Sequence, residues 1–241
     1  MTFRIGVIRL DIDPYESAER DNLRLAFKQM KFSLNLYNFS ASLCYETLQY
    51  LSTQTSEKEP FEIEKCVAYM LLTRTTGLMQ SIKALVLRGY YCEALILERS
   101  FWEALGLCSY LTLNRKEAEK WYDGERIDLS LTMRPECILK VLELNTKPSS
   151  FENIYRWLCN FVHSNSPAIL GSSSFFDCPD ENTKRITVAI PSRFERKIVQ
   201  GLASYPTIVL LIMTRIFDKE LPDEHKKKLE KAMISLTKEH Q

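Results

Sequence analysis

Apolar residues recur at steps of three and four along much of the chain, which is the spacing that places them on one face of an α-helix. The pattern predicts a first long helix over residues 15–51 and, after a polar loop over 52–60, further helices. The apolar face of this first helix is expected to consist of Leu23, Phe27, Met30, Leu34, Tyr37, Ala41, Cys44 and Leu48. A charged segment that follows Pro222 predicts a terminal helix over 223–238.

Two central segments, 61–87 and 90–113, are apolar on nearly all sides. A helix that is apolar all round lies in the middle of a fold. Only Arg88 and Gly89 stand clearly between the two segments, so they are expected to form an antiparallel helical hairpin. Shorter helices are predicted over 117–122, 135–144 and 151–165.

The character of the chain changes over 168–192, where glycine, serine, aspartate and asparagine gather. Residues 175–176 and 185–190 have the composition of short strands, which predicts a small β-ribbon or a loop insertion near 168–192. A last major apolar helix is expected over 193–217, with Pro206 placed to kink it. The predicted fold is an all-α helical bundle around the central antiparallel hairpin.

The length of 241 residues suits one domain over 1–241, with a core at about 61–217 and with helices 15–51 and 223–238 as additions. Only seven glycines are present, which argues against a turn-rich β fold, and the net charge of +1 gives no general attraction to nucleic acid. The seven cysteines are odd in number and form no CxxC pair, which favours a reducing compartment and a cytoplasmic location. No apolar run is long enough to span a bilayer, so no membrane partner is expected.

The sequence lacks the motifs of several common classes of nucleotide-binding, catalytic and metal site. There is no GxGxxG or GxxxxGK[ST] loop for nucleotide phosphates, no GxSxG nucleophile turn and no HExxH metal motif. The three histidines and scattered cysteines have no metal-ligand spacing. We therefore expect neither a metal nor a cofactor.

His163 is the only histidine outside the C-terminal tail, and it follows Arg156 by seven residues on a predicted helix. Seven residues are almost two turns, so both side chains leave the same side of that helix. Histidine suits proton transfer near neutral pH, and arginine suits a phosphate or a developing oxyanion. Asn160, one turn below His163, could orient either group. The alternative is that His163 caps the end of its helix and Arg156 pairs with Glu152 in an ordinary ion pair.

Charged residues also interrupt the apolar hairpin segments. Buried charges must be paired, because an unpaired one costs several kcal/mol. The structural interpretation is a core network that includes an Arg99–Glu103 pair, spaced one turn apart. The functional interpretation is that these residues line a cleft beside the His163 helix and support it. The charged residues are Arg74, Glu93, Glu98, Arg99 and Glu103.

Two segments together resemble a known family. Residues 88–104 read RGYYCEALILERSFWEA and residues 155–163 read YRWLCNFVH. Their order and separation resemble an uncharacterised prokaryotic group of HEPN-like proteins of the DUF5677 type, over roughly 69–166. The wider superfamily is all-helical and usually dimeric. Its active members are metal-independent ribonucleases with an arginine and a histidine on a late helix, and many act as toxins or in antiviral defence.

By position, the resemblance makes Arg156 and His163 the catalytic pair, with His163 moving the proton and Arg156 stabilising the phosphate. It implies RNA as a partner, a homodimer and, for a toxin, an antitoxin-like protein partner. Trp157 stands where such ribonucleases usually carry a polar residue. The expected function is thus a metal-independent endoribonuclease of a toxin or antiviral defence system. The alternative is a non-catalytic helical binding or regulatory module of unknown ligand.

Overall fold

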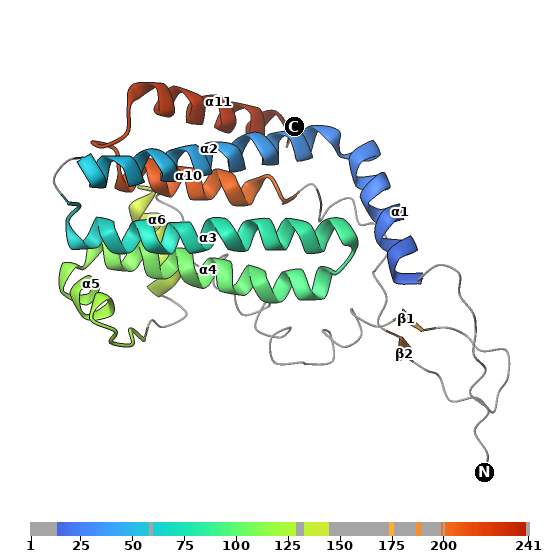
Figure 1. Ribbon diagram of the computed structural model, residues 1–241, viewed down its shortest axis with the longest axis horizontal. Helices are drawn as coiled ribbons and strands as arrows, with labels where there is room; N and C mark the ends of the chain where they lie inside the picture. Colours follow the sequence, from blue (N-terminus) through green and yellow to red (C-terminus); the bar gives the residue numbers. More distant parts are fainter. Residues whose placement is uncertain are drawn as a thin grey trace, which may run out of the picture.

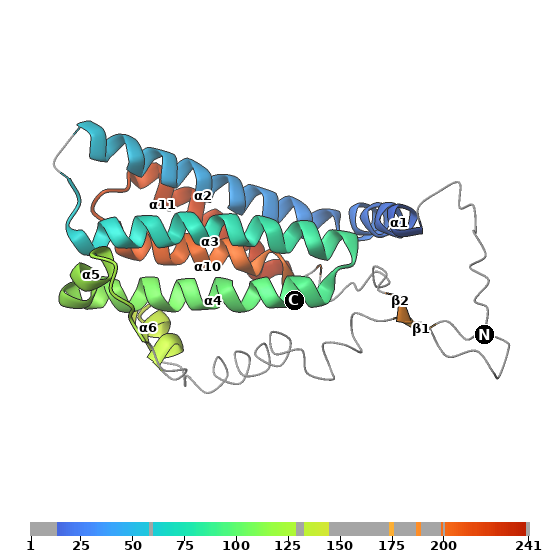
Figure 2. The same cartoon turned by 60° about the horizontal axis from the view of Figure 1, so that its bottom comes forward.

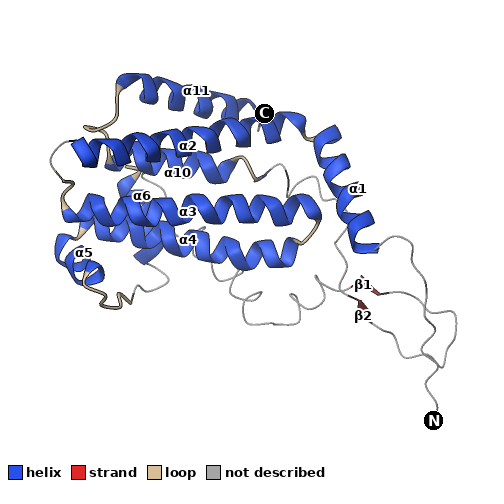
Figure 3. Cartoon of the chain, viewed as in Figure 1, coloured by secondary structure: helices blue, strands red, loops and turns tan. Residues whose placement is uncertain are grey.

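The computed structural model describes residues 14–57, 60–128, 133–144, 174–175, 187–188, 199 and 201–239. Within these residues the chain is an all-α bundle of packed helices, as predicted (Figures 1 and 3). Its helices are α1 (Pro14–Gln29), α2 (Lys31–Glu57), α3 (Ile63–Arg88), α4 (Tyr91–Leu113), α5 (Arg115–Tyr122), α6 (Met133–Val141), α10 (Ser204–Ile216) and α11 (Asp223–Glu239).

Helices α3 and α4 form the predicted central hairpin and lie side by side along their length (Figures 1 and 2). Gly89 makes the reversal with a φ of 91°, a conformation that residues with a Cβ adopt only under strain. The Gly89 and Tyr90 amides donate to the carbonyls of Val86 and Leu85 at 3.1 and 3.0 Å, which closes the end of α3. The turn is therefore set by a local signal in the sequence.

A second layer of helices covers the hairpin. Helix α2 packs against α10 and α11, and α10 also packs against α3 (Figure 2). The interior between the layers is apolar, with Tyr37, Leu72, Met79 and Phe217 essentially inaccessible to solvent. The Tyr37 hydroxyl donates to the Met79 carbonyl at 2.9 Å, so even this buried polar group has a partner. Helix α6 packs on α4, and α5 lies against the start of α3.

The prediction of one helix over 15–51 is wrong in its first half. Helices α1 and α2 meet at Met30 at a sharp angle (Figure 1), and α2 continues to Glu57 into the predicted loop. The Met30 amide donates to the Ala26 carbonyl at 2.8 Å, and the Leu34 amide donates to the Met30 carbonyl at 3.0 Å, one on each side of the bend. The helical hydrogen bonds of α1 therefore end at Met30, and those of α2 begin there.

Contacts between α1 and the end of the hairpin explain the bend. Asn22 Nδ2 donates to the Arg88 carbonyl at 3.1 Å, and the Tyr90 hydroxyl donates to Glu19 at 2.7 Å. These bonds hold α1 across the α3–α4 turn. As a consequence Phe27, which the apolar pattern placed in the core, is 56% exposed.

The last apolar segment also differs from its prediction. Leu202 and Ala203 form a turn, and α10 begins at Ser204, so no single helix runs over 193–217. Pro206 does not kink a helix but lies in the first turn of α10, where a backbone N–H has no partner to lose. The terminal helix α11 has almost the predicted bounds.

Strand β1 (Ser174–Phe175) pairs antiparallel with β2 (Thr187–Val188), with Ser174 opposite Val188. Both lie in the segment where a small β-ribbon or loop insertion was expected. The other residues of 168–192 lie outside those that the structure describes.

Candidate functional site

The predicted site residues fall into two groups. Arg156, Asn160 and His163 lie outside the residues that the structure describes, so the proposed catalytic pair stays a prediction. Arg74, Arg99 and Glu103, predicted to support it, lie on the central hairpin, the first on α3 and the other two on α4.

Arg99 and Glu103 form the ion pair that their spacing predicted. Arg99 Nε donates to Glu103 Oε1 at 3.1 Å, and the two side chains are 22% and 35% exposed. Partial burial limits screening by water and salt, so this pair interacts more strongly than an open surface pair. It places a matched positive and negative charge on one face of α4.

Arg74 does not belong to a buried network, contrary to the structural interpretation. Its side chain is exposed and makes no hydrogen bond or ion pair with any residue that the structure describes. Glu93 is exposed as well. Both occupy outer faces of the hairpin helices, where a charge remains hydrated and needs no partner.

A pocket of about 410 Å³ brings Arg74 and Glu103 together. It lies between α3, α4 and α5, and the chain after α5 contributes one wall. We call it the hairpin pocket. Its lining residues are Met70, Leu71, Arg74, Ser100, Glu103, Ala104, Leu107, Trp121 and Ile127.

The hairpin pocket combines apolar walls with hydrogen-bond donors. The Ser100 hydroxyl and the Trp121 indole N–H, like the Arg74 guanidinium, have no hydrogen-bond partner among the described residues. Trp121 and Ile127 belong to the apolar side of the pocket, together with Met70, which is 48% exposed. Such a pocket suits a ligand that carries both an apolar surface and acceptor oxygens.

Sequence reasoning missed Ser100, Trp121 and Ile127. One signal was present for Trp121, because α5 is short and amphipathic and must bury its apolar side against a neighbour. The pattern could not show that this neighbour is the outer face of the hairpin.

Glu98 is a further charged group of α4, and it does not line the hairpin pocket. Trp102 Nε1 donates to Glu98 Oε1 at 3.3 Å, and Tyr205 of α10 also bonds to this carboxylate. Burial raises the pKa of the Glu98 carboxyl, and the two hydrogen bonds oppose that rise. Burial, followed by the Glu98 charge, raises the pKa of Tyr205. These groups form a polar contact between α4 and α10.

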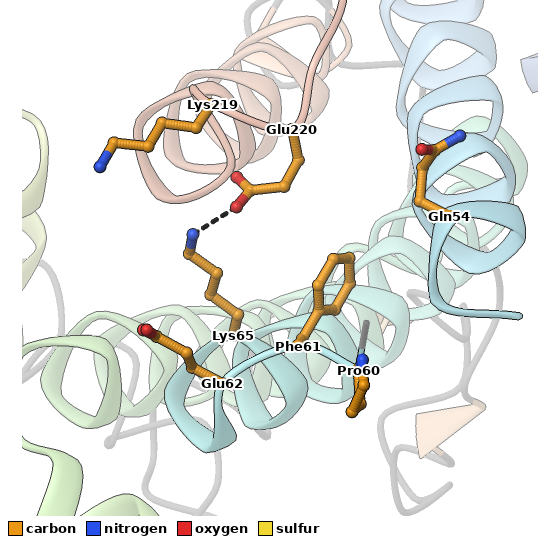
Figure 4. Close-up of a pocket in the computed structure, with 7 residues that line it drawn as sticks. All are labelled: Gln54, Pro60, Phe61, Glu62, Lys65, Lys219 and Glu220. Atoms are coloured by element: carbon orange, nitrogen blue, oxygen red, sulfur yellow. Dashed lines mark hydrogen bonds and ion pairs between the residues drawn. The ribbon is translucent and has the colours of Figure 1, made fainter. Parts of the chain in front are cut away.

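A larger pocket, of about 530 Å³, lies where the α2–α3 connection meets the turn after α10 (Figure 4). Lys65 Nζ donates to Glu220 Oε1 at 2.5 Å across it, and Phe61 and Gln54 bound its other side. Its two lysines are balanced by two glutamates, so it has no net charge to attract an ion. We call it the end pocket; its lining residues are Gln54, Pro60, Phe61, Glu62, Lys65, Lys219 and Glu220.

Within the described residues, no three histidine, cysteine, aspartate or glutamate side chains are placed to hold a metal ion. Over the same residues, no helix combines the length and the apolar character that crossing a lipid bilayer requires. No protein-family model, curated protein or solved structure matches this chain.

Proposed function

We propose that this protein is a HEPN-like, metal-independent endoribonuclease in which His163 and Arg156 are the catalytic residues. The observation that supports it most is the meeting of Arg74 and Glu103, from the two central helices, at one open pocket. Those two residues were expected to line a cleft beside the catalytic helix. The all-α bundle around a central hairpin is the architecture that the sequence resemblance implies.

The proposed reaction is an internal phosphoryl transfer. The ribose 2′-oxygen attacks the adjacent phosphorus as His163 removes the 2′-hydroxyl proton, the bond from phosphorus to the 5′-oxygen of the next nucleotide breaks, and that oxygen leaves with the proton returned by His163. The products are a 2′,3′-cyclic phosphate and a free 5′-hydroxyl. Arg156 stabilises the additional negative charge on the phosphorane, and Asn160 orients the pair.

The hairpin residues have supporting roles in this proposal. Arg74, which has no ion pair with any residue that the structure describes, offers its positive charge to the RNA backbone. The Arg99–Glu103 pair is a fixed dipole on α4, and the proposal gives it the role of supporting the catalytic helix. The enzyme would act in the cytoplasm as a homodimer in a toxin or antiviral defence system, and a toxin of this kind would be held inactive by an antitoxin-like protein.

The test is RNA cleavage by the purified chain in the presence of a metal chelator. We expect wild type to cut RNA and His163→Ala to cut at least about 100-fold more slowly, as loss of a general base predicts. His240→Ala is the matched control, since it removes a histidine of the C-terminal tail, and it should keep full activity. Circular dichroism would show that each variant is folded.

An intact RNA after incubation with wild type would overturn the proposal, and so would equal cleavage by His163→Ala. The alternative function, a non-catalytic helical binding or regulatory module, is favoured by one observation. The Arg99 and Glu103 charges satisfy each other, as expected of a network whose role is packing. Saturable RNA binding without cleavage would support this second function.

A further inference from the structure

We infer that the hairpin pocket binds a nucleoside phosphate, with the phosphate on Arg74 and the base against Trp121 and Met70. Two kinds of ligand have this chemistry, namely a free nucleotide and one nucleotide of an RNA strand. Binding of RNA here rests on the proposed ribonuclease function, whereas binding of a free nucleotide does not.

The first support is that Arg74 has no carboxylate partner among the described residues. Every other arginine of α1, α3, α4, α5 and α10 is paired with a carboxylate: Arg20 with Glu16, Arg24 with Asp21, Arg88 with Glu19, Arg99 with Glu103, Arg115 with Glu119 and Arg215 with Glu143. Arg74 alone of this set makes no such bond with a carboxylate of the described residues. A guanidinium binds phosphate through two parallel hydrogen bonds, so it is the side chain best suited to capture this anion.

The second support is the set of donors around that cation. The Ser100 hydroxyl and the Trp121 indole N–H are also without partners among the described residues, and both line the same pocket. Among the described residues that line the pocket, the one carboxylate is Glu103, and it is neutralised by Arg99 at 3.1 Å. The pocket therefore presents donors and a positive charge, which favours a ligand rich in acceptor oxygens.

The third support is the apolar wall. Indole rings stack on nucleobases whatever the base, and methionine adapts to flat surfaces. Trp121, Met70 and Ile127 lie in the pocket with Leu107, and the volume of about 410 Å³ falls in the usual range for small-ligand pockets. Inorganic phosphate would leave this wall unused, and an apolar ligand would leave Arg74 unused. A nucleoside phosphate uses both.

The experiment measures binding of the four nucleoside 5′-monophosphates by calorimetry, beside inorganic phosphate and the free nucleosides. We expect saturable binding of the nucleotides and weaker binding of phosphate or nucleoside alone. Arg74→Gln should weaken nucleotide affinity roughly tenfold, and Arg74→Lys less, because it keeps the charge but loses the planar fork. Trp121→Leu should weaken it about tenfold through lost stacking.

The matched control is Lys219→Gln. It removes one exposed positive charge from the end pocket and should leave nucleotide affinity unchanged. Because Arg74 is exposed, Arg74→Gln is expected to fold, so its result stands even if Trp121→Leu is unstable. Absence of saturable nucleotide binding to wild type would overturn the inference. So would equal affinity of wild type and folded Arg74→Gln.

A second arm uses a 2′-O-methyl oligoribonucleotide, which has no 2′-hydroxyl to attack the phosphate. Binding of this strand, weakened by Arg74→Gln, assigns the site to RNA. Binding of monophosphates without the strand assigns it to a free nucleotide and overturns binding of RNA here. Both experiments measure binding and not cleavage, so a failure of the ribonuclease proposal would appear in the cleavage assay alone.

Discussion

At the residue scale, the fold changes the ionisation of the Glu98 carboxyl. Its carboxyl is half-buried between α4 and α10, and burial raises its pKa above the ordinary 4.5. Well below pH 4.5 the acid is neutral in the folded and unfolded chains alike. As the pH rises, the unfolded chain loses the proton first, so the folded state loses stability until its own, higher pKa has been passed.

We therefore predict that Glu98→Gln, which stays neutral and keeps hydrogen-bonding atoms for Trp102 and Tyr205, gains stability relative to wild type as the pH rises from 4.5 towards neutral. Urea unfolding at several pH values measures the difference in free energy of unfolding. Glu93→Gln, an exposed change on the same helix, should show no such trend. A difference that is constant with pH would contradict the prediction.

At the scale of the element, substitution by alanine should change the free energy of unfolding in opposite directions at two glycines, one inside α3 and one at its end. Gly89 has a φ of 91°, where a Cβ costs about 1–2 kcal/mol, so Gly89→Ala should lower the free energy of unfolding by that amount. Gly77 lies inside α3 with no atom within 4 Å of an added Cβ, so Gly77→Ala should raise it by roughly 0.5–1 kcal/mol. Chemical denaturation of both variants checks the two signs together.

Elements that depend on a local signal could be predicted from the sequence, and elements that depend on distant contacts could not. The hairpin was predictable because its turn depends on Gly89 and its helices on adjacent apolar runs. The bend at Met30 was not, because the three- and four-residue pattern continues through it. Its cause lies far along the chain, in the bond from Asn22 to the Arg88 carbonyl. The role of Pro206 was predicted wrongly because proline is found in the first turn of a helix as well as at a kink.

At the scale of the whole molecule, Lys65 and Glu220 join the start of α3 to the turn after α10 (Figure 4). Both side chains are about three-quarters buried, and Glu220 Oε2 has no hydrogen-bond partner among the described residues. Lys65→Met would leave the carboxylate without its cation, and we expect a loss of about 1–3 kcal/mol in the free energy of unfolding.

The double variant Lys65→Met with Glu220→Gln is the comparison for this pair. It removes the charge that the single variant leaves unpaired, so it should be more stable than Lys65→Met alone. Thermal and urea unfolding of the wild type, both single variants and the double variant would give the coupling energy. Strictly additive effects would mean that the pair contributes nothing to the closure of the bundle.

The candidate site was predictable only where it depends on one helix. Arg99 and Glu103 are one turn apart on α4, so their pairing follows from spacing alone. Arg74 comes to the same pocket through the packing of α3 on α4, and Trp121 through the return of α5 along the hairpin. Contacts between elements depend on the whole set of packed faces, which a periodic pattern does not specify.

The position of α10 has a consequence for the order in which the chain folds. The hairpin α3–α4 closes between neighbouring segments, so it can form early and quickly. The buried face of α2, in contrast, is completed by α10, as the contact from Cys44 Sγ to the Pro206 carbonyl illustrates. During synthesis on the ribosome this apolar face must therefore stay uncovered until residues 204–216 have emerged, and it is the part of the nascent chain most in need of protection.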